Sequence, residues 1–240
     1  MTQKTILITG ANKSIGFETA RQLGALGHRI WLGSRDGARG QAAVERLVGE
    51  GHDVRLLEID VVDDGSVRQA VGRMQQEDGR LDVLINNAGI PGGMSKPSQQ
   101  ELADIRTVYE TNVFAPIRVT QAFLPLLRSA GGGSVIMVSS GLGSLGWVND
   151  PSHPFHAVNI LGYNSSKTAL NAVTVAFAKE LAAESIHVNS VDPGYTATDF
   201  NGHSGYRSAE QAAAGIVWLA SQDGTGPTGG FYFDQAVVPW

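Results

Sequence analysis

The sequence contains no cysteine among its 240 residues. Disulfide bonds, thiolate metal sites and a cysteine nucleophile are therefore excluded, and no metal site of another kind is predicted. Long apolar runs are absent too, and none approaches the roughly 18 residues that a membrane-spanning helix needs. The first apolar run, Thr5 to Thr9, is too short for the core of a signal peptide, and Gly10 interrupts it. We expect a soluble cytoplasmic protein without a membrane partner.

Charge is also scarce: charged residues make up 17% of the chain, and 18 Lys and Arg against 23 Asp and Glu give a net charge of −5. A mildly acidic surface argues against nucleic acid as the main partner. Apolar residues reach 42%, which excludes a disordered chain and permits a large core. No composition break or repeat divides the sequence, so we expect residues 1–240 to form a single domain.

Short apolar segments alternate with longer amphipathic ones. The short segments are rich in β-branched residues and predict strands over 5–9, 28–34, 53–60, 81–87, 134–140, 187–191 and 230–233. The longer ones predict helices over 16–26, 37–50, 65–76, 98–129, 165–184 and 208–221, with a kink or break in the fourth at Pro116. This order predicts an α/β fold: a doubly wound, Rossmann-type sheet of seven parallel strands with helices on both faces.

Glycine is abundant, with 30 residues that cluster at turns. The first strand runs into Gly10, and Ser14 and Gly16 follow at offsets of four and six before a helix. Glycines allow close backbone approach, and a helix N-terminus offers free N–H groups, so this segment is a candidate pyrophosphate site. The spacing is not the common G-x-G-x-x-G, and an ordinary strand–turn–helix connection is the alternative. The candidate residues here are Gly10, Asn12, Lys13, Ser14, Ile15 and Gly16.

Arg35 directly follows the second predicted strand, and Lys13 projects from the first loop. Two cations suit the 2′-phosphate of NADP, whereas an acid near this position would favour NAD. Asp36 is the competing acid, and we interpret it as a residue that opens the next helix. The sequence therefore favours NADP(H) over NAD, with two solvated surface cations as the alternative.

Tyr163 and Lys167 are four residues apart in a helical segment and so share one face. A nearby ammonium favours the phenolate, so we expect Lys167 to lower the pKa of Tyr163 and make it a general acid or base. A pair with this spacing also occurs by chance. Ser139 and Ser140 end the fifth predicted strand, where ligands bind in such sheets. Asn112 lies inside a predicted helix, which suggests either a function or a surface position.

Several motifs in this order resemble the short-chain dehydrogenase/reductase family over almost the whole length. They are T-G-A-N-K-S-I-G from Thr9, Asp60-Val61, N-N-A-G from Asn86, Asn112 within T-N-V, V-S-S from Val138, Y-N-S-S-K from Tyr163, and P-G-Y-T-A-T from Pro193. The stretch after Arg35 and the final V-V-P-W are similar to the NADPH-dependent carbonyl and terpenoid-ketone reductases of that family.

The resemblance implies a role for each matched residue. Tyr163 would donate a proton to the carbonyl oxygen, and Lys167 would bind the nicotinamide ribose. Ser140 would orient the carbonyl, and Asn112 would hold a water that connects Lys167 to solvent. The implied cofactor contacts, beyond the first loop and Arg35, are Asp60, Val61, Asn87, Ala88, Gly89, Tyr163, Lys167, Pro193, Gly194, Thr196 and Thr198.

Two features depart from the family. Ser14 replaces its middle glycine, and the Cβ atom of a serine limits φ, so we expect cofactor binding with altered affinity. A longer segment, within residues 143–162, separates Ser140 from Tyr163 and should overhang the substrate side. Relatives with such an insertion tend to be monomers, which leaves a monomer or a homo-oligomer open.

Other side chains near the expected substrate side have two interpretations. Residues 195–206 are a candidate lid, with a plain surface connection as the alternative. Trp147 and Phe155 line an apolar pocket or cover the core. His153 and His156 are expected to be solvated, with contact to the substrate as the alternative.

Taken together, these features predict NADPH-dependent reduction of a ketone or aldehyde to an alcohol, with a small and apolar carbonyl substrate. One alternative is a non-catalytic NADP-binding regulatory or interaction protein, which an intact Tyr-Lys pair disfavours. A sugar-nucleotide epimerase or dehydratase is disfavoured because few residues follow Thr198.

Overall fold

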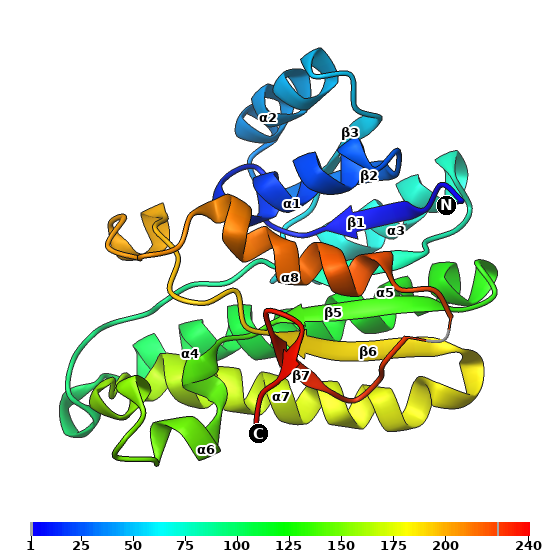
Figure 1. The fold of residues 1–240 in the computed structure, drawn as a ribbon. Helices are drawn as coiled ribbons and strands as arrows, with labels where there is room; N and C mark the ends of the chain where they lie inside the picture. The colour runs from blue at the N-terminus through cyan, green and yellow to red at the C-terminus, as the bar shows by residue number, and fades with distance from the viewer. Residues whose placement is uncertain (1, 225) are drawn as a thin grey trace.

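The computed structural model describes residues 2–224 and 226–240, whose strands form one sheet of eight (Figure 1). The strands are β1 Thr5–Ile8, β2 Arg29–Ser34, β3 Val54–Glu58, β4 Val83–Asn86, β5 Gly133–Val138, β6 Ile186–Val191, β7 Phe231–Phe233 and β8 Ala236–Val237. Their order is β3-β2-β1-β4-β5-β6-β7-β8. The first seven are parallel, as predicted, and β8 adds an antiparallel edge that the sequence analysis missed.

Both faces of the sheet are covered, which explains the continuously apolar strands. Successive residues of a strand point to opposite faces. Leu7 of β1 packs into one cluster with side chains of α3, α5 and α7, whereas Ile6 and Ile8 pack into another with α1, α2 and α8. All three are fully buried, and burial of each such side chain contributes about 2 kcal/mol.

The helices agree with the predicted periodicity, with differences at their ends. Their bounds are α1 Ser14–Ala25, α2 Gly37–Gly49, α3 Asp64–Glu77, α4 Leu102–Tyr109, α5 Ala115–Ser129, α6 Leu145–Val148, α7 Leu161–Leu181 and α8 Ala209–Ser221. Helix α7 begins at residue 161, four residues earlier than predicted. Among the described residues, no helix combines the length and apolarity needed to cross a bilayer.

The predicted break in the fourth helix is confirmed. A π turn, Glu110–Phe114, separates α4 from α5, and within it the Ala115 N–H donates to the Glu110 carbonyl, five residues back. Pro116 has no N–H to donate to the Asn112 carbonyl, so regular α-helical bonding cannot continue there. Asn112 lies in this turn and is buried.

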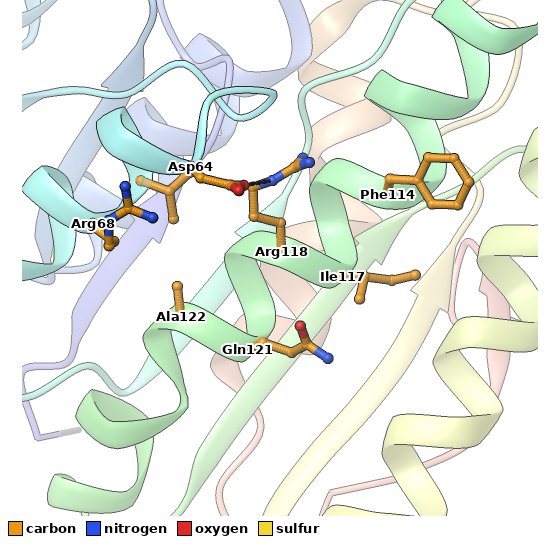
Figure 2. Close-up of a pocket in the computed structure, with 8 residues that line it drawn as sticks. Asp64, Arg68, Phe114, Ile117, Arg118, Gln121 and Ala122 are labelled. Atoms are coloured by element: carbon orange, nitrogen blue, oxygen red, sulfur yellow. Dashed lines mark hydrogen bonds and ion pairs between the residues drawn. The ribbon is translucent and has the colours of Figure 1, made fainter.

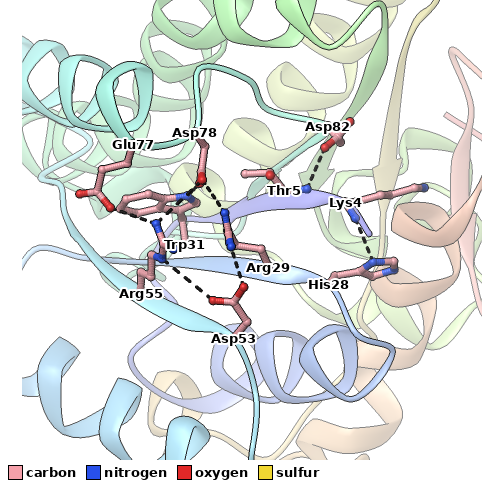
Figure 3. Close-up of polar contacts among 10 residues, drawn as sticks. All are labelled: Lys4, Thr5, His28, Arg29, Trp31, Asp53, Arg55, Glu77, Asp78 and Asp82. Atoms are coloured by element: carbon pink, nitrogen blue, oxygen red, sulfur yellow. Dashed lines mark hydrogen bonds and ion pairs between the residues drawn. The ribbon is translucent and has the colours of Figure 1, made fainter. Parts of the chain in front are cut away.

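At the amino edge of the sheet, a polar cluster closes the core (Figure 3). The Asp78 carboxylate accepts a hydrogen bond from Trp31 Nε1 at 2.7 Å and pairs with Arg29 Nη1 at 2.6 Å (Figure 3). Arg29 also pairs with Asp53 at 2.8 Å, and the Arg55 guanidinium lies over the Trp31 ring. The Trp31 indole N–H and the Asp78 carboxylate therefore both have partners, and these contacts stabilise the edge opposite the candidate site.

Candidate active site

The predicted site residues outside the helices all follow the carboxyl ends of parallel strands. Residues after β1 to β6 therefore gather at one edge of the sheet, as a doubly wound fold requires. The strand order reverses between β1 and β4, so the loops after these two strands lie at the centre of that edge.

The loop after β1 leaves no room for side chains at two glycines. Gly10 has φ +63°, and a Cβ atom on Gly16 would lie 2.6 Å from Asn87 Nδ2. That amide nitrogen donates to the Thr9 carbonyl at 2.9 Å and to the Gly10 carbonyl at 3.1 Å, which fixes the loop against the end of β4. No side chain caps α1, and its first turn contains no acid. Its free N–H groups therefore suit a phosphate.

Ser14, at the start of α1, has φ +53°. This left-handed conformation favours glycine, because a Cβ atom then crowds the backbone. The sequence analysis predicted that the Cβ atom of Ser14, which replaces the family's glycine, limits φ. The positive φ of this serine shows that the limit appears as backbone strain. Of the other candidate residues, Asn12 lies in the loop before α1 and Ile15 in the first turn of α1.

The cations expected to bind a 2′-phosphate differ in their surroundings. Arg35 is exposed at the end of β2. Lys13 instead binds Asp199 of the candidate lid at 2.7 Å, a contact that the sequence analysis missed. Asp36 caps α2, accepting a hydrogen bond from the Arg39 N–H at 2.9 Å, which confirms its interpretation as a helix-opening residue.

The residues expected beside the adenine and along the cofactor are held by backbone contacts. The Asp60 carboxylate accepts a hydrogen bond from the Val62 N–H at 3.2 Å, and the Val61 carbonyl accepts one from Arg118. After β4, the N–H groups of Asn87 and Ala88 both donate to Thr9 Oγ1. The loops after β1 and β4 are therefore bonded to each other, although they are 78 residues apart along the chain.

Tyr163 and Lys167 lie together on α7, as their spacing predicts. Lys167 Nζ is 5.7 Å from the centroid of the Tyr163 ring and donates to the Val138 carbonyl at 2.8 Å. Burial lowers the pKa of Lys167 to about 8, and the negative charge of Asp192 opposes that shift.

The expected lowering of the Tyr163 pKa is wrong for this structure. Burial raises the pKa of Tyr163, and a hydrogen bond with the Ser140 side chain offsets this only in part. The Lys167 ammonium lies near the ring and bonds a backbone carbonyl, so it does not compensate for the desolvation of the phenolate. The phenol consequently holds its proton at neutral pH, the form required of a proton donor.

Asn112 is buried beside this pair, so its predicted functional position is favoured over a surface one. Its amide accepts a hydrogen bond from the Ile90 N–H and donates to the Ile90 carbonyl, both at 2.9 Å. A Cβ atom on Gly89 would lie 3.3 Å from Asn112 Oδ1 and 3.7 Å from Lys167 Nζ. Gly89 therefore keeps open the space between the asparagine and the lysine.

The loop after β6 is folded by its own side chains. Gly194 has φ +73°, and Thr196 Oγ1 donates to the Gly194 carbonyl at 3.0 Å. Thr198 is buried and caps a short turn, Asp199–Asn201. Pro193 begins this loop at the same sheet edge as Ser140.

The candidate lid contacts the site at two points. The Phe200 ring meets the Tyr163 ring edge-on, with centroids 5.6 Å apart. Asp199, its neighbour, binds Lys13 of the phosphate loop and also His203 at 2.9 Å. One segment thus covers the phenol and contacts the loop after β1.

An aromatic cluster covers the turn after Ser140. Trp147 stacks on His153 with ring centroids 4.7 Å apart, and Phe155 contacts both rings. A Cβ atom on Gly141 would lie 3.0 Å from Trp147, so the cluster adjoins the residue after Ser140. His153 is half-buried between the Trp147 and Phe155 rings and so only partly solvated, whereas His156 is exposed as expected.

Asp192 was missed by the sequence analysis. It is 4% exposed, and it lies directly between β6 and Pro193. The sequence did contain a signal for this residue. Asp192 is an acid at the end of an apolar strand, directly before the proline and glycine of the matched motif.

A groove between α3 and α5 lies apart from these residues (Figure 2). Arg118 on its wall pairs with Glu110 at 2.9 Å and with Asp64, and the Phe114 ring is about half exposed. None of the candidate catalytic residues lines it. The groove is therefore not part of the candidate active site.

Comparison with known proteins agrees with this geometry. The family model for short chain dehydrogenases matches residues 4–208. The chain belongs to the short-chain dehydrogenase/reductase family. It is 36% identical over 228 residues to a short-chain dehydrogenase of Penicillium roqueforti, covering 92% of this chain and 90% of that protein.

Other relatives of this short-chain dehydrogenase/reductase are named as reductases. It is 30% identical over 275 residues to the NADPH carbonyl reductase 1 of Sus scrofa, covering 99% and 94% of the two chains. Its structure is similar to that of an NADPH-bound carbonyl reductase from chicken fatty liver, with a TM-score of 0.87, 25% identity and full coverage of both chains. The protein is therefore an oxidoreductase.

Proposed function

We propose that this enzyme reduces a ketone or aldehyde to an alcohol with NADPH, in a single domain whose residues 143–162 and 195–206 cover the substrate. The observation that carries the proposal is that the Lys167 ammonium and the Ser140 side chain both lie close to Tyr163, at the carboxyl edge of the sheet. The carbonyl reductases among its relatives support the same reaction.

The residues present fit NADP(H). The glycine positions and the uncapped start of α1 would hold the pyrophosphate, with Arg35 and Lys13 at the 2′-phosphate. Gly89 leaves the space beside Lys167 where a nicotinamide ribose would bind. NADPH, when bound, supplies the hydride for the carbonyl carbon.

The chain's own residues handle the proton. Ser140 donates a hydrogen bond to the carbonyl oxygen and orients it, while Tyr163 gives its proton to the same oxygen. The Lys167 ammonium, which lies near the ring, then favours the phenolate without outweighing the burial that disfavours it. Asn112 holds a water through which Lys167 exchanges protons with solvent.

The substrate side favours an apolar carbonyl compound. Trp147 and Phe155 lie over the turn that follows Ser140, and Phe200 lies over Tyr163. Three aromatic rings close to the proposed carbonyl position favour substrates with apolar substituents.

The test is a panel of ketones and aldehydes assayed in parallel with NADPH and NADH. We expect NADPH-dependent turnover with at least one apolar carbonyl compound. Tyr163→Phe should lose that activity by a factor of about 1,000 while it still binds NADPH, because it removes only the transferred proton. Full turnover by this variant, or NADPH binding without turnover across the panel, would contradict the proposal.

A further inference from the structure

The aromatic cluster of Trp147, His153 and Phe155 depends on a helix that is too short to form by itself. Helix α6, Leu145–Val148, has four residues and carries Trp147. An isolated helix needs about 12 or more residues to be stable in water, so contacts with other parts of the chain must hold this one. Those contacts therefore fix the Trp147 ring beside the turn that follows Ser140.

Ser144 begins this helix and is fully buried. Its Oγ accepts a hydrogen bond from the Trp147 N–H at 3.1 Å, and the same hydroxyl donates to the Pro239 carbonyl at 2.6 Å. The Ser144 N–H donates to the Gly141 carbonyl at 3.0 Å. This one residue therefore connects the turn after Ser140, the start of α6 and a segment 95 residues further along the chain.

Residues 238–240, which follow β8, lie beside α6 and support it a second time (Figure 1). The Gly146 N–H donates to the Trp240 carbonyl at 3.1 Å. Val238 is 2% exposed, and its N–H donates to the Phe231 carbonyl at 2.8 Å. The Trp240 ring stacks on the buried Phe231 ring, with centroids 5.7 Å apart. Contacts thus run without a break from β7 through residues 238–240 to α6.

At its other side, the aromatic cluster lies against the turn that follows the proposed carbonyl contact. A Cβ atom on Gly141 would overlap the Phe155 ring and lie 3.0 Å from Trp147. Phe155 contacts the rings of both Trp147 and His153. A shift of α6 would therefore move these rings relative to Ser140 and change the apolar contact offered to a group on the carbonyl carbon.

We propose that Ser144 is a positioning residue for substrate selectivity: together with residues 238–240 it holds Trp147 where the aromatic cluster binds a bulky apolar group, such as an aryl group, on the carbonyl carbon. This inference rests on the proposed function and narrows its substrate class. Ser144 acts through Trp147 and contacts neither substrate nor cofactor in the proposed reaction.

The first test follows the rings and needs no reaction. The chain has six histidines, and the ring current of an indole shifts the proton NMR signals of an imidazole stacked on it. His153→Gln identifies the His153 signals. In Ser144→Ala we expect these signals to lose most of that shift and to move toward the positions of exposed histidines.

Ser129→Ala is the matched control for this test. Ser129 also donates its hydroxyl to a proline carbonyl, that of Pro125, at 2.9 Å, but it lies at the end of α5. We expect Ser129→Ala to leave the His153 signals and the kinetics unchanged.

The second test compares two ketones that the parent enzyme reduces, one with an aryl group and one with small alkyl groups alone. In Ser144→Ala we expect KM for the aryl ketone to rise about tenfold, with its kcat and the kcat/KM of the alkyl ketone within about twofold of the parent values. Trp240→Ala, which removes the stack on Phe231, should give the same pattern. The double variant should be no worse than the more affected single variant, because both residues act through α6.

Unchanged His153 signals in Ser144→Ala overturn the inference, as does an unchanged KM for the aryl ketone, an equal loss for both ketones, or a substrate range without aryl ketones. If Ser144→Ala fails to fold, Trp240→Ala, at a residue that is 41% exposed, takes its place in both tests. If no carbonyl compound is reduced, the proposed function fails while the NMR comparison still decides whether Ser144 positions the rings.

Discussion

At the scale of a single residue, Ser14 is held in a strained backbone conformation in the candidate phosphate loop. Its backbone adopts the left-handed φ of +53° that a glycine tolerates without strain. A serine in this conformation costs about 1 kcal/mol, and the surrounding contacts of the loop and α1 hold it there.

Ser14→Gly should therefore stabilise the protein. We expect an increase in unfolding free energy of about 1 kcal/mol and a rise in Tm of about 3 °C, measured by thermal denaturation. Ser129→Gly at the end of α5, where φ is not positive, is the control and should lower the Tm instead. A lower Tm for Ser14→Gly would show that the hydroxyl matters more than the strain.

Lys167 determines the expected pH dependence of carbonyl reduction. Its pKa of about 8 means that it is an ammonium below that pH and loses its charge above it. Burial raises the pKa of Tyr163, so the phenol keeps its proton through the same range. We expect kcat/KM for reduction to be constant at neutral pH and to fall above about pH 8, as measured across a buffer series. A profile that rises between pH 7 and 9 would contradict this assignment.

At the scale of elements, the candidate lid contacts two parts of the proposed cofactor site. The segment 195–206 places Phe200 over Tyr163 and Asp199 against Lys13. A cofactor phosphate that approaches Lys13 competes with the Asp199 carboxylate for the same ammonium.

Asp199→Asn should consequently tighten NADP(H) binding. Both partners of the ion pair are exposed, so the expected gain is modest, about two- to threefold in Kd by fluorescence titration. NAD(H), which lacks the 2′-phosphate, should bind the variant and the parent equally. The gain should also disappear when Lys13→Gln is combined with it. An equal gain for both cofactors would place Lys13 elsewhere on the ligand.

The strands, the helices and the Tyr-Lys face could be predicted from the sequence because they follow local periodicity. The spacing of Tyr163 and Lys167 is enough to place them on one face of α7. Pro116 predicts the break between α4 and α5, because proline has no N–H for a helical hydrogen bond. The pairing of Lys13 with Asp199 could not be predicted, because it depends on the path of a loop 186 residues away. The raised pKa of Tyr163 could not be predicted either, because it depends on burial by other elements and not on the spacing of residues along the sequence.

The β8 strand was missed for a related reason. It contains two exposed residues after a turn in which Asp234 and Gln235 have positive φ. A segment so short has no periodicity of its own, and its pairing with β7 is a property of the assembled sheet.

At the scale of the whole molecule, the two edges of the sheet contribute differently to stability. The carboxyl edge gathers a strained serine, a buried lysine and a buried aspartate, all of which oppose stability. The amino edge carries the hydrogen-bonded side chains of Asp78, Trp31 and Arg29, which contribute stability (Figure 3).

Asp78→Ala should separate stability from activity. It leaves the indole N–H of Trp31 without its acceptor and removes one partner of Arg29, so we expect a loss of about 3 kcal/mol and a Tm lower by about 9 °C. Below its Tm, kcat/KM should remain within twofold of the parent value. Loss of activity in the folded variant would show that the two edges are coupled.

The stacked rings of Trp147 and His153 give the substrate-side segment an optical signature. The emission of an indole depends on the groups in contact with its ring, so the part of the emission that comes from Trp147, one of four tryptophans, reports whether the two rings remain together. A carbonyl compound that enters between the segment and Ser140 would part them and alter the emission. Occupancy of the enzyme can thus be followed without any attached dye.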